Sequence, residues 1–213
     1  KEKKGDLETG ENNWKNNCVL AKLVYVYEGI EPESPKSKRH KLVNPHYFSG
    51  VYDGADNAKL WDEVYAYLDS HYDLKKVKKI YLNADGGTWI QSGKKRIAGI
   101  TSVLDEFHLQ KYLLKMTSHL KDSVDDARKE LCDAIKSGTK ADFQSVVEQL
   151  KVCAETEATE KRIEESGAYI LSNWTAAKIR LKDRETVKGC SAEGHVSHVL
   201  SSRMSSRPMG WSR

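Results

Sequence analysis

The sequence predicts a mixed α/β fold in which an all-helical insertion interrupts a sheet-bearing core. Three observations predict this class. Apolar runs rich in β-branched and aromatic residues, typical of strands, lie at 19–27, 77–84 and 97–104. From residue 105 to about 185 the apolar residues recur instead at helical spacing. A last helix then opens at Glu193 and carries histidine, arginine and serine in place of a charged, solvated face.

Size and composition fit a cytoplasmic protein. The 213 residues are enough to bury a core without disulfides. The four cysteines are far apart and form no Cys-x-x-Cys pair, so neither a zinc site nor a secreted disulfide framework is indicated. There is no apolar run of about 18 residues and no apolar segment after the basic residues at the start, so we expect no membrane span, signal peptide or membrane partner.

The net charge is a weak bias and does not by itself establish DNA binding. It is +4, from 35 basic and 31 acidic residues. Its distribution says more, because basic residues follow the two acids discussed below, Asp85 and Glu193. These basic residues are Lys94, Lys95, Arg96, Arg203 and Arg207. Positive charge there suits a polyanionic substrate, and an ordinary solvated loop and helix end fits equally well.

The first elements follow in order from local pattern. Residues 19–27 are almost continuously apolar, which predicts a central strand buried on both faces. Residues 29–46 contain three prolines and a basic cluster and predict a mobile loop. A short strand is expected at 47–52. A helix then starts at Asp56 or Asn57, and its apolar face consists of Leu60, Val64, Tyr67 and Leu68.

Asp85 directly follows the second buried-type strand, 77–84, and precedes Gly86 and Gly87. The carboxyl ends of strands are where ligands gather in open α/β sheets, so a functional acid is expected at this position. Asp-Gly is also a common turn dipeptide, and from this feature alone plain turn chemistry is the favoured interpretation.

A third strand, 97–104, runs directly into Asp105 at the start of a helix. A helix-start aspartate is more often an N-cap than a ligand. His108 lies one turn later on the same side, so a carboxylate–imidazole pair is available, although a lone histidine is usually structural.

From residue 105 onward, three amphipathic stripes predict helices separated by short breaks. The first ends at Gly138, the second follows a possible Thr139 cap, and the third is interrupted by Gly167. We therefore expect three parts: a core segment at 1–104, the helical insertion at 105–185, and a core helix at 186–213.

The segments ADGGTWI, LDEFHLQKY and above all GCSAEGHVSHVLSSRMSSRPMGWS are similar to bacterial insertion-sequence DDE transposases of the ISLre group, related to the Mutator-like transposases. The resemblance runs through essentially the whole chain. It implies a ribonuclease H-like core interrupted by the helical insertion, with Mg²⁺ as cofactor, in two ions, or Mn²⁺ in its place. It also implies DNA strand cleavage and strand transfer at element ends, in a bacterial, nucleoid-associated enzyme that forms a homo-oligomer at full length.

Residue by residue, the resemblance assigns Asp85 to the second acid of the triad and Glu193 to the final glutamate, both as metal ligands. Asp105 and His108 match the family's accessory Asp-x-x-His signature. The basic residues named above become DNA contacts. Trp89 lies near Asp85 in the sequence and is a candidate either for stacking on a base or for packing in the core. The packing role is the favoured one. Carboxylates suit this role because Mg²⁺ is usually held by one or two carboxylates plus phosphate oxygens.

One departure from the family pattern concerns the first catalytic aspartate, which should lie on the first core strand. No residue here occupies that place, and Asp6 and Asp53 are the only nearby acids worth considering as substitutes. We therefore expect an amino-terminally truncated fragment that is catalytically crippled alone. Two other interpretations stay open: a nuclease or resolvase that only hydrolyses, and a non-catalytic fragment that binds nucleic acid.

Overall fold

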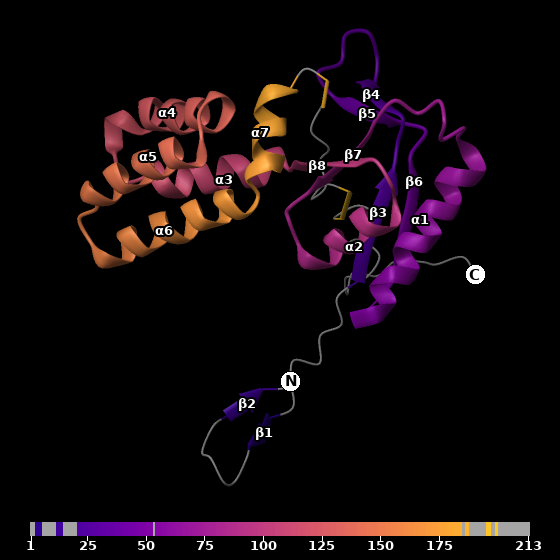
Figure 1. Cartoon of the computed structure of the whole chain (residues 1–213), viewed down its shortest axis with the longest axis horizontal. Coiled ribbons are helices and arrows are strands. Elements are labelled where there is room, and N and C mark those ends of the chain that lie inside the picture. The colour runs from indigo at the N-terminus through magenta and orange to yellow at the C-terminus, as the bar shows by residue number, and fades with distance from the viewer. Residues whose placement is uncertain are drawn as a thin grey trace. The chain divides into compact units, whose positions relative to one another are not determined.

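The computed structural model describes residues 3–5, 12–14, 21–52, 54–184, 186–187, 195–196 and 199. Contacts divide the chain into two compact units, one of residues 1–67 with 193–213 and one of residues 68–192. The class is mixed α/β, as predicted, and Figure 1 shows its elements. No helix in the described part is long and apolar enough to cross a bilayer. The part boundaries expected at 104 and 185 stay predictions.

The strands of the first unit form antiparallel pairs. β3 (Ala21–Val26) pairs with β6 (His46–Val51), and β1 (Lys3–Gly5) pairs with β2 (Asn12–Trp14). The expected strand at 47–52 is therefore confirmed. The strand expected at 19–27 is also confirmed, but its burial on both faces is not, because all six residues of β3 are only half-buried.

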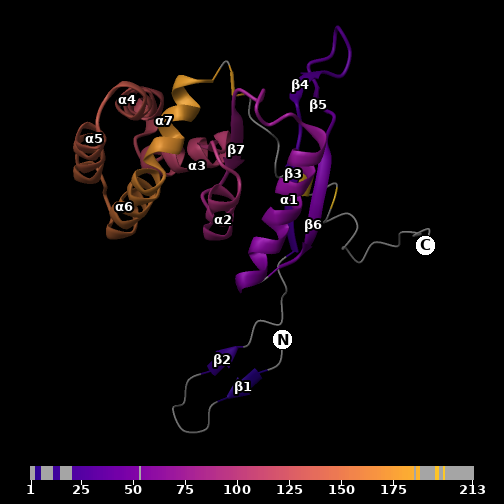
Figure 2. The ribbon, with the colours of Figure 1, turned by 45° about the vertical axis from the view of Figure 1, so that its right-hand side comes forward.

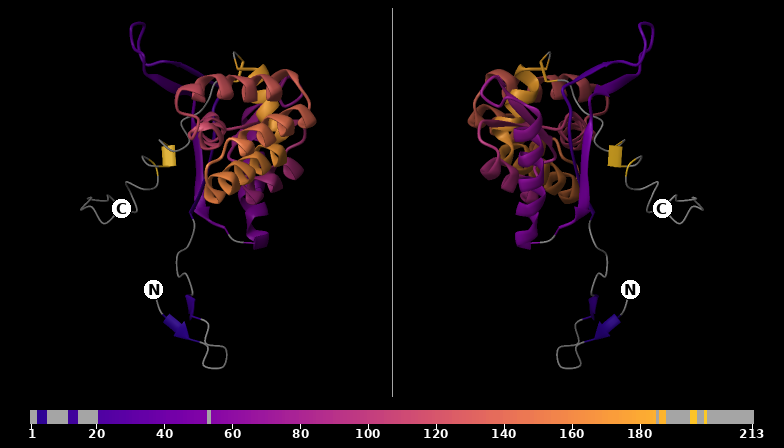
Figure 3. Two further views of the ribbon diagram at one scale, coloured as in Figure 1. Left: turned by 90° about the vertical axis from the view of Figure 1, so that its left-hand side faces the viewer. Right: turned by 90° about the vertical axis from the view of Figure 1, so that its right-hand side faces the viewer.

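The loop expected at 29–46 is wrong. This segment contains β4 (Gly29–Pro32), paired antiparallel with β5 (His40–Val43), and Figure 3 shows this hairpin extending beyond β3 and β6. Proline is tolerated where no strand N–H has to donate. Pro32 ends β4 and Pro45 precedes β6, so the prolines mark strand ends and do not prevent pairing.

The helix α1 (Asn57–His71) begins where the sequence predicts and follows the short 3₁₀ helix η1 (Gly54–Asp56). Within the first unit, Tyr67 stacks on His46 of β6, with ring centroids 4.0 Å apart. Figure 2 shows α1 alongside β6. The expected apolar face is confirmed, because its residues Leu60, Val64 and Leu68 are buried together with Trp61.

In the second unit, β7 (Ile80–Ala84) and β8 (Ile100–Leu104) pair in parallel. They are joined by α2 (Thr88–Arg96), which corrects the expectation of a loop after Asp85. Parallel strands need a crossover connection, usually a helix. The sequence contains no capping signal for this helix, because its N-cap is Gly87 and no side chain caps it.

The helical block expected from residue 105 onward is confirmed, and its helices pack around one apolar core. The elements are α3 (Glu106–Thr117), η2 (Lys121–Ser123), α4 (Val124–Ser137), α5 (Lys140–Val152), α6 (Glu157–Ser172) and α7 (Trp174–Lys182). The expected Thr139 cap forms a capping box with Asp142. Gly167 does not interrupt the third stripe. It lies inside α6, where a Cβ would come within 3.2 Å of Val147, so the absence of a side chain lets α5 and α6 approach closely.

Val147→Ala should destabilise the protein by about 2 kcal/mol, because it removes two buried methyl groups and leaves a cavity against α6. Val147 is 6% exposed. The matched control is Val152→Ala on the same helix, where the side chain is 88% exposed and the change should fall within ~0.5 kcal/mol. Urea unfolding of both variants measures the two values, and equal losses would contradict the packing described for α5.

Candidate functional site

Two aspartates lie side by side at the carboxyl edge of the parallel strands. Ala84, the last residue of β7, is opposite Leu104, the last residue of β8. Asp85 and Asp105 follow these two residues, and the Asp105 N–H donates to the Ala84 carbonyl at 2.9 Å. This edge is where ligands bind in open α/β sheets, so it is the candidate functional site.

The carboxylate of Asp85 is exposed and only partly engaged. Its Oδ1 accepts the Gly87 N–H at 2.9 Å, so the turn interpretation of Asp-Gly is confirmed. Gly86 has φ +87°, and a Cβ there would clash with the Asn173 amide, so glycine is required at this position. Within the described residues, no other hydrogen bond or ion pair to this carboxylate is found, which leaves Oδ2 open to a ligand.

Asp105 is buried, and one of its two carboxylate oxygens makes two contacts. It caps α3 by accepting the His108 N–H at 3.3 Å, which confirms the N-cap interpretation. The same oxygen, Oδ2, lies 3.2 Å from Nδ1 of His108, so the expected carboxylate–imidazole pair also forms. Through this oxygen, Asp105 holds the His108 ring beside the strand edge.

Tyr169 of α6 also reaches this edge, and no local pattern in the sequence identifies it. Its hydroxyl donates to the main-chain carbonyl of Asp85, and its ring stacks on Tyr112 of α3 with centroids 3.7 Å apart. Burial raises the pKa of Tyr169 well above its usual value, and Tyr112, Asp85 and Asp105 add to the effect. The hydroxyl therefore stays protonated and remains a donor at neutral pH.

The buried guanidinium of Arg180 ties α7 to both strand ends. Arg180 is 1% exposed. Its Nε donates to the Leu104 carbonyl at 2.8 Å, its Nη1 to the Val187 carbonyl at 2.6 Å, and its Nη2 to Oδ1 of Asn83. Sequence reasoning missed this residue. The available signal was an arginine on the same helix face as the buried Ala177.

The remaining predicted residues divide into two groups. Lys94, Lys95 and Arg96 are exposed in the last turn of α2, where cations also complement the helix dipole. Trp89 is half-buried in the first turn of the same helix. The other predicted residues lie outside the described part of the chain, and these are Asp6, Asp53, Glu193, Arg203 and Arg207.

The described residues supply part of what a magnesium site needs. Among them, no group of three or more histidine, cysteine, aspartate or glutamate side chains is arranged to hold a metal ion. Mg²⁺ takes one or two protein carboxylates and fills its shell with water and phosphate oxygens. The exposed carboxylate of Asp85 fits as one such ligand.

A family model described as an uncharacterised protein family, UPF0236, matches residues 12–213. The UPF0236 protein TTE0402 of Caldanaerobacter subterraneus is 40% identical over 192 residues, which is 90% of this chain and 37% of that protein. In Streptococcus gallolyticus, a UPF0236 protein named for the vanSb 3′ region is 24% identical, over 89% of this chain and 41% of that protein. The chain thus spans less than half the length of these relatives. No solved structure matches it.

Arg180→Met should cost about 3 kcal/mol or more, because it removes a buried charge and leaves the carbonyls of Leu104 and Val187 without their donor. Arg184→Met is the matched control. Arg184 also pairs with Glu106, at 3.0 Å, but its side chain is 65% exposed, so its loss should cost at most about 1 kcal/mol. Chemical denaturation measures the free energy of unfolding of both variants. A small loss of stability for Arg180→Met would show that the buried hydrogen bonds of Arg180 are dispensable.

Tyr169→Phe should cost about 1 kcal/mol at pH 8, because the hydrogen bond to Asp85 is lost. The raised pKa of Tyr169 stabilises the fold below about pH 10, where an unfolded tyrosine titrates, and this contribution is lost as the pH rises further. The difference between wild type and variant should therefore shrink above pH 10. Unfolding free energies at pH 8 and above pH 10 test this, with the exposed Tyr65→Phe as the control. A constant difference would contradict it.

Proposed function

The chain belongs to the UPF0236 family, and we propose that it is part of a DDE transposase that cuts and joins DNA at the ends of an insertion sequence. The family description assigns no activity, so the proposal rests on three supports: the way relatives are named, the order of structural elements, and the chemistry available at Asp85.

The observation that carries the proposal is the number of loci that encode one relative. A protein of Caldanaerobacter subterraneus, 38% identical to this chain, bears eleven locus designations in its name, and another, 40% identical, bears four. One protein encoded at many places in a genome is the expected result of an element that moves and multiplies.

The element order supports a ribonuclease H-like core. An antiparallel pair, β3 and β6, is followed by α1, and then by the parallel unit of β7, α2 and β8. The helical block comes after β8, before the segment that bears Glu193. This succession is compatible with the ribonuclease H-like core that the transposase resemblance implies, and it places Asp85, the candidate second acid, directly after β7.

In this proposal Asp85 and Glu193 would supply carboxylates for the divalent ions, and His108, positioned by Asp105, would brace the strand edge beside Asp85. Bound metal ions activate an attacking oxygen and stabilise a leaving oxygen in phosphoryl transfer. The exposed Oδ2 of Asp85 suits the ligand role because it has no competing partner in the described residues. The cations of α2 add favourable potential for a phosphodiester.

The test uses a full-length family member that carries this sequence as its matching segment. A labelled duplex from the end of its own element is incubated with Mg²⁺ or Mn²⁺, and both cleavage and joining to target DNA are measured. Asp85→Asn should lower both steps by about 10³-fold, because a metal ligand is lost. Asp126→Asn, at an exposed aspartate of α4, should leave both unchanged.

Three outcomes would count against the proposal. Cleavage without joining would favour a hydrolytic nuclease with the same core. DNA binding without any metal-dependent cleavage would favour a non-catalytic binding fragment. Full activity in Asp85→Asn would remove Asp85 from the site.

A further inference from the structure

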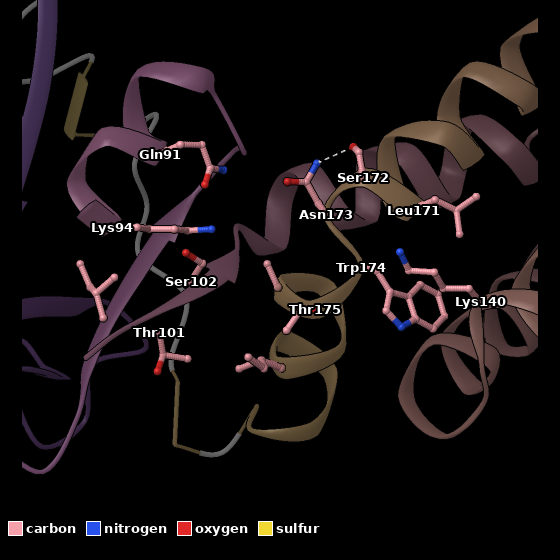
Figure 4. Close-up of a pocket in the computed structure, with 13 residues that line it drawn as sticks. Gln91, Lys94, Thr101, Ser102, Lys140, Leu171, Ser172, Asn173, Trp174 and Thr175 are labelled. Atoms are coloured by element: carbon pink, nitrogen blue, oxygen red, sulfur yellow. Dashed lines mark hydrogen bonds between the residues drawn. The ribbon is translucent and has the colours of Figure 1, made fainter. Parts of the chain in front are cut away.

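The second unit contains a pocket of about 620 Å³ that the Asp85 carboxylate does not line. Its walls come from α2, β8, the start of α5, the end of α6 and α7. Figure 4 shows Lys94 and Ser102 on one side and Lys140 with Trp174 on the other. Pockets of this volume suit a ligand larger than a single inorganic ion.

The charged residues that line the pocket are all basic. Lys94 of α2 and Lys140 of α5 both line it, and none of the described lining residues is acidic. Both lysines are exposed, and no ion pair to either is found in the described part of the chain. Two cations from separate elements therefore face one hollow without a carboxylate to neutralise them, which favours an anionic ligand.

The pocket also offers hydrogen-bond donors. The Ser102 hydroxyl is buried and has no hydrogen-bond partner among the described residues, which is costly unless a ligand or water supplies one. Thr175 lines the pocket in the first turn of α7, a helix of nine residues whose N-cap, Asn173, makes no side-chain cap hydrogen bond. The N–H groups at a helix start bind phosphate oxygens well.

Trp174 is less suited to stacking on a ligand. Its ring lies 5.7 Å from that of Phe143 and packs against the apolar core of the helical block. The recognition available in the pocket is therefore ionic and hydrogen-bonding instead of aromatic. This combination fits phosphate oxygens and gives little means to distinguish one base from another.

We propose that this pocket binds the phosphodiester backbone of a DNA strand, with Lys94 and Lys140 contacting phosphates and Ser102 donating a hydrogen bond. The proposal rests on the transposase function and adds to it a strand-holding site formed jointly by α2, β8 and the helical block. The pocket is larger than one phosphate group, and its two lysines can contact two phosphates. A continuous strand therefore fits the pocket better than a single free anion.

The test measures binding of the whole chain to a fluorescein-labelled single-stranded oligonucleotide by anisotropy, with EDTA present and over a range of salt concentrations. Lys94→Gln/Lys140→Gln should weaken binding about 10-fold or more and lower the slope of log affinity against log salt by roughly 0.7 for each lost contact. The control Lys129→Gln/Lys136→Gln removes the same charge from exposed positions of α4. Circular dichroism checks that all variants are folded.

The outcomes separate this inference from the proposed function. Equal effects of the two double variants on DNA binding would overturn the proposal that the pocket binds DNA. Strong competition by millimolar inorganic phosphate or mononucleotide would also overturn it, because it would indicate a site for a free anion. Neither result affects cleavage that depends on Asp85. A wild-type chain without DNA affinity would overturn the inference, whereas loss of binding in the pocket variant alone would support it.

Discussion

The buried guanidinium of Arg180 is the constraint on which the second unit depends. A charge taken out of water costs several kcal/mol unless hydrogen bonds and a counter-charge replace its hydration. Arg180 finds those partners on both parallel strands, at Asn83 and Leu104, with Glu106 at 3.9 Å. These partners are close enough only when α7 and the two strand ends are in place together. The helical block is therefore a structural part of the strand edge.

The residues around Asp85 show the same dependence. Tyr169 of α6 donates to its carbonyl, and the amide of Asn173, between α6 and α7, closes against Gly86. The conformation of the loop at Asp85 thus depends on Tyr169 and Asn173, which follow it by more than eighty residues in the chain. In the proposed transposase this arrangement links the helical insertion both to the acid and to the strand-holding pocket beside α7.

Much of the fold could be predicted because its signals are local. The periodicity of apolar residues identified α1 and the helices from 106 to 182, and Thr139 and Asp105 cap helices as their types suggest. Where prediction failed, the local signal was outweighed by pairing or packing. Pro32 ends β4 and Pro45 precedes β6 without preventing strand pairing. Gly167 allows close helix packing, and α2 forms after two glycines because a parallel pair needs a crossover.

By itself, the sequence determined that Asp85 and Asp105 each follow a strand, and that Asp105 and His108 stand one turn apart, because these relations involve neighbours in the chain. Only the tertiary structure decided that the two acids are adjacent, that Asp105 is buried while Asp85 is exposed, and that Tyr169 and Arg180 belong to the same edge. Those relations join residues that are distant in the chain. Hydrogen bonds between such residues depend on how the elements pack, and a local sequence pattern contains no information about that packing.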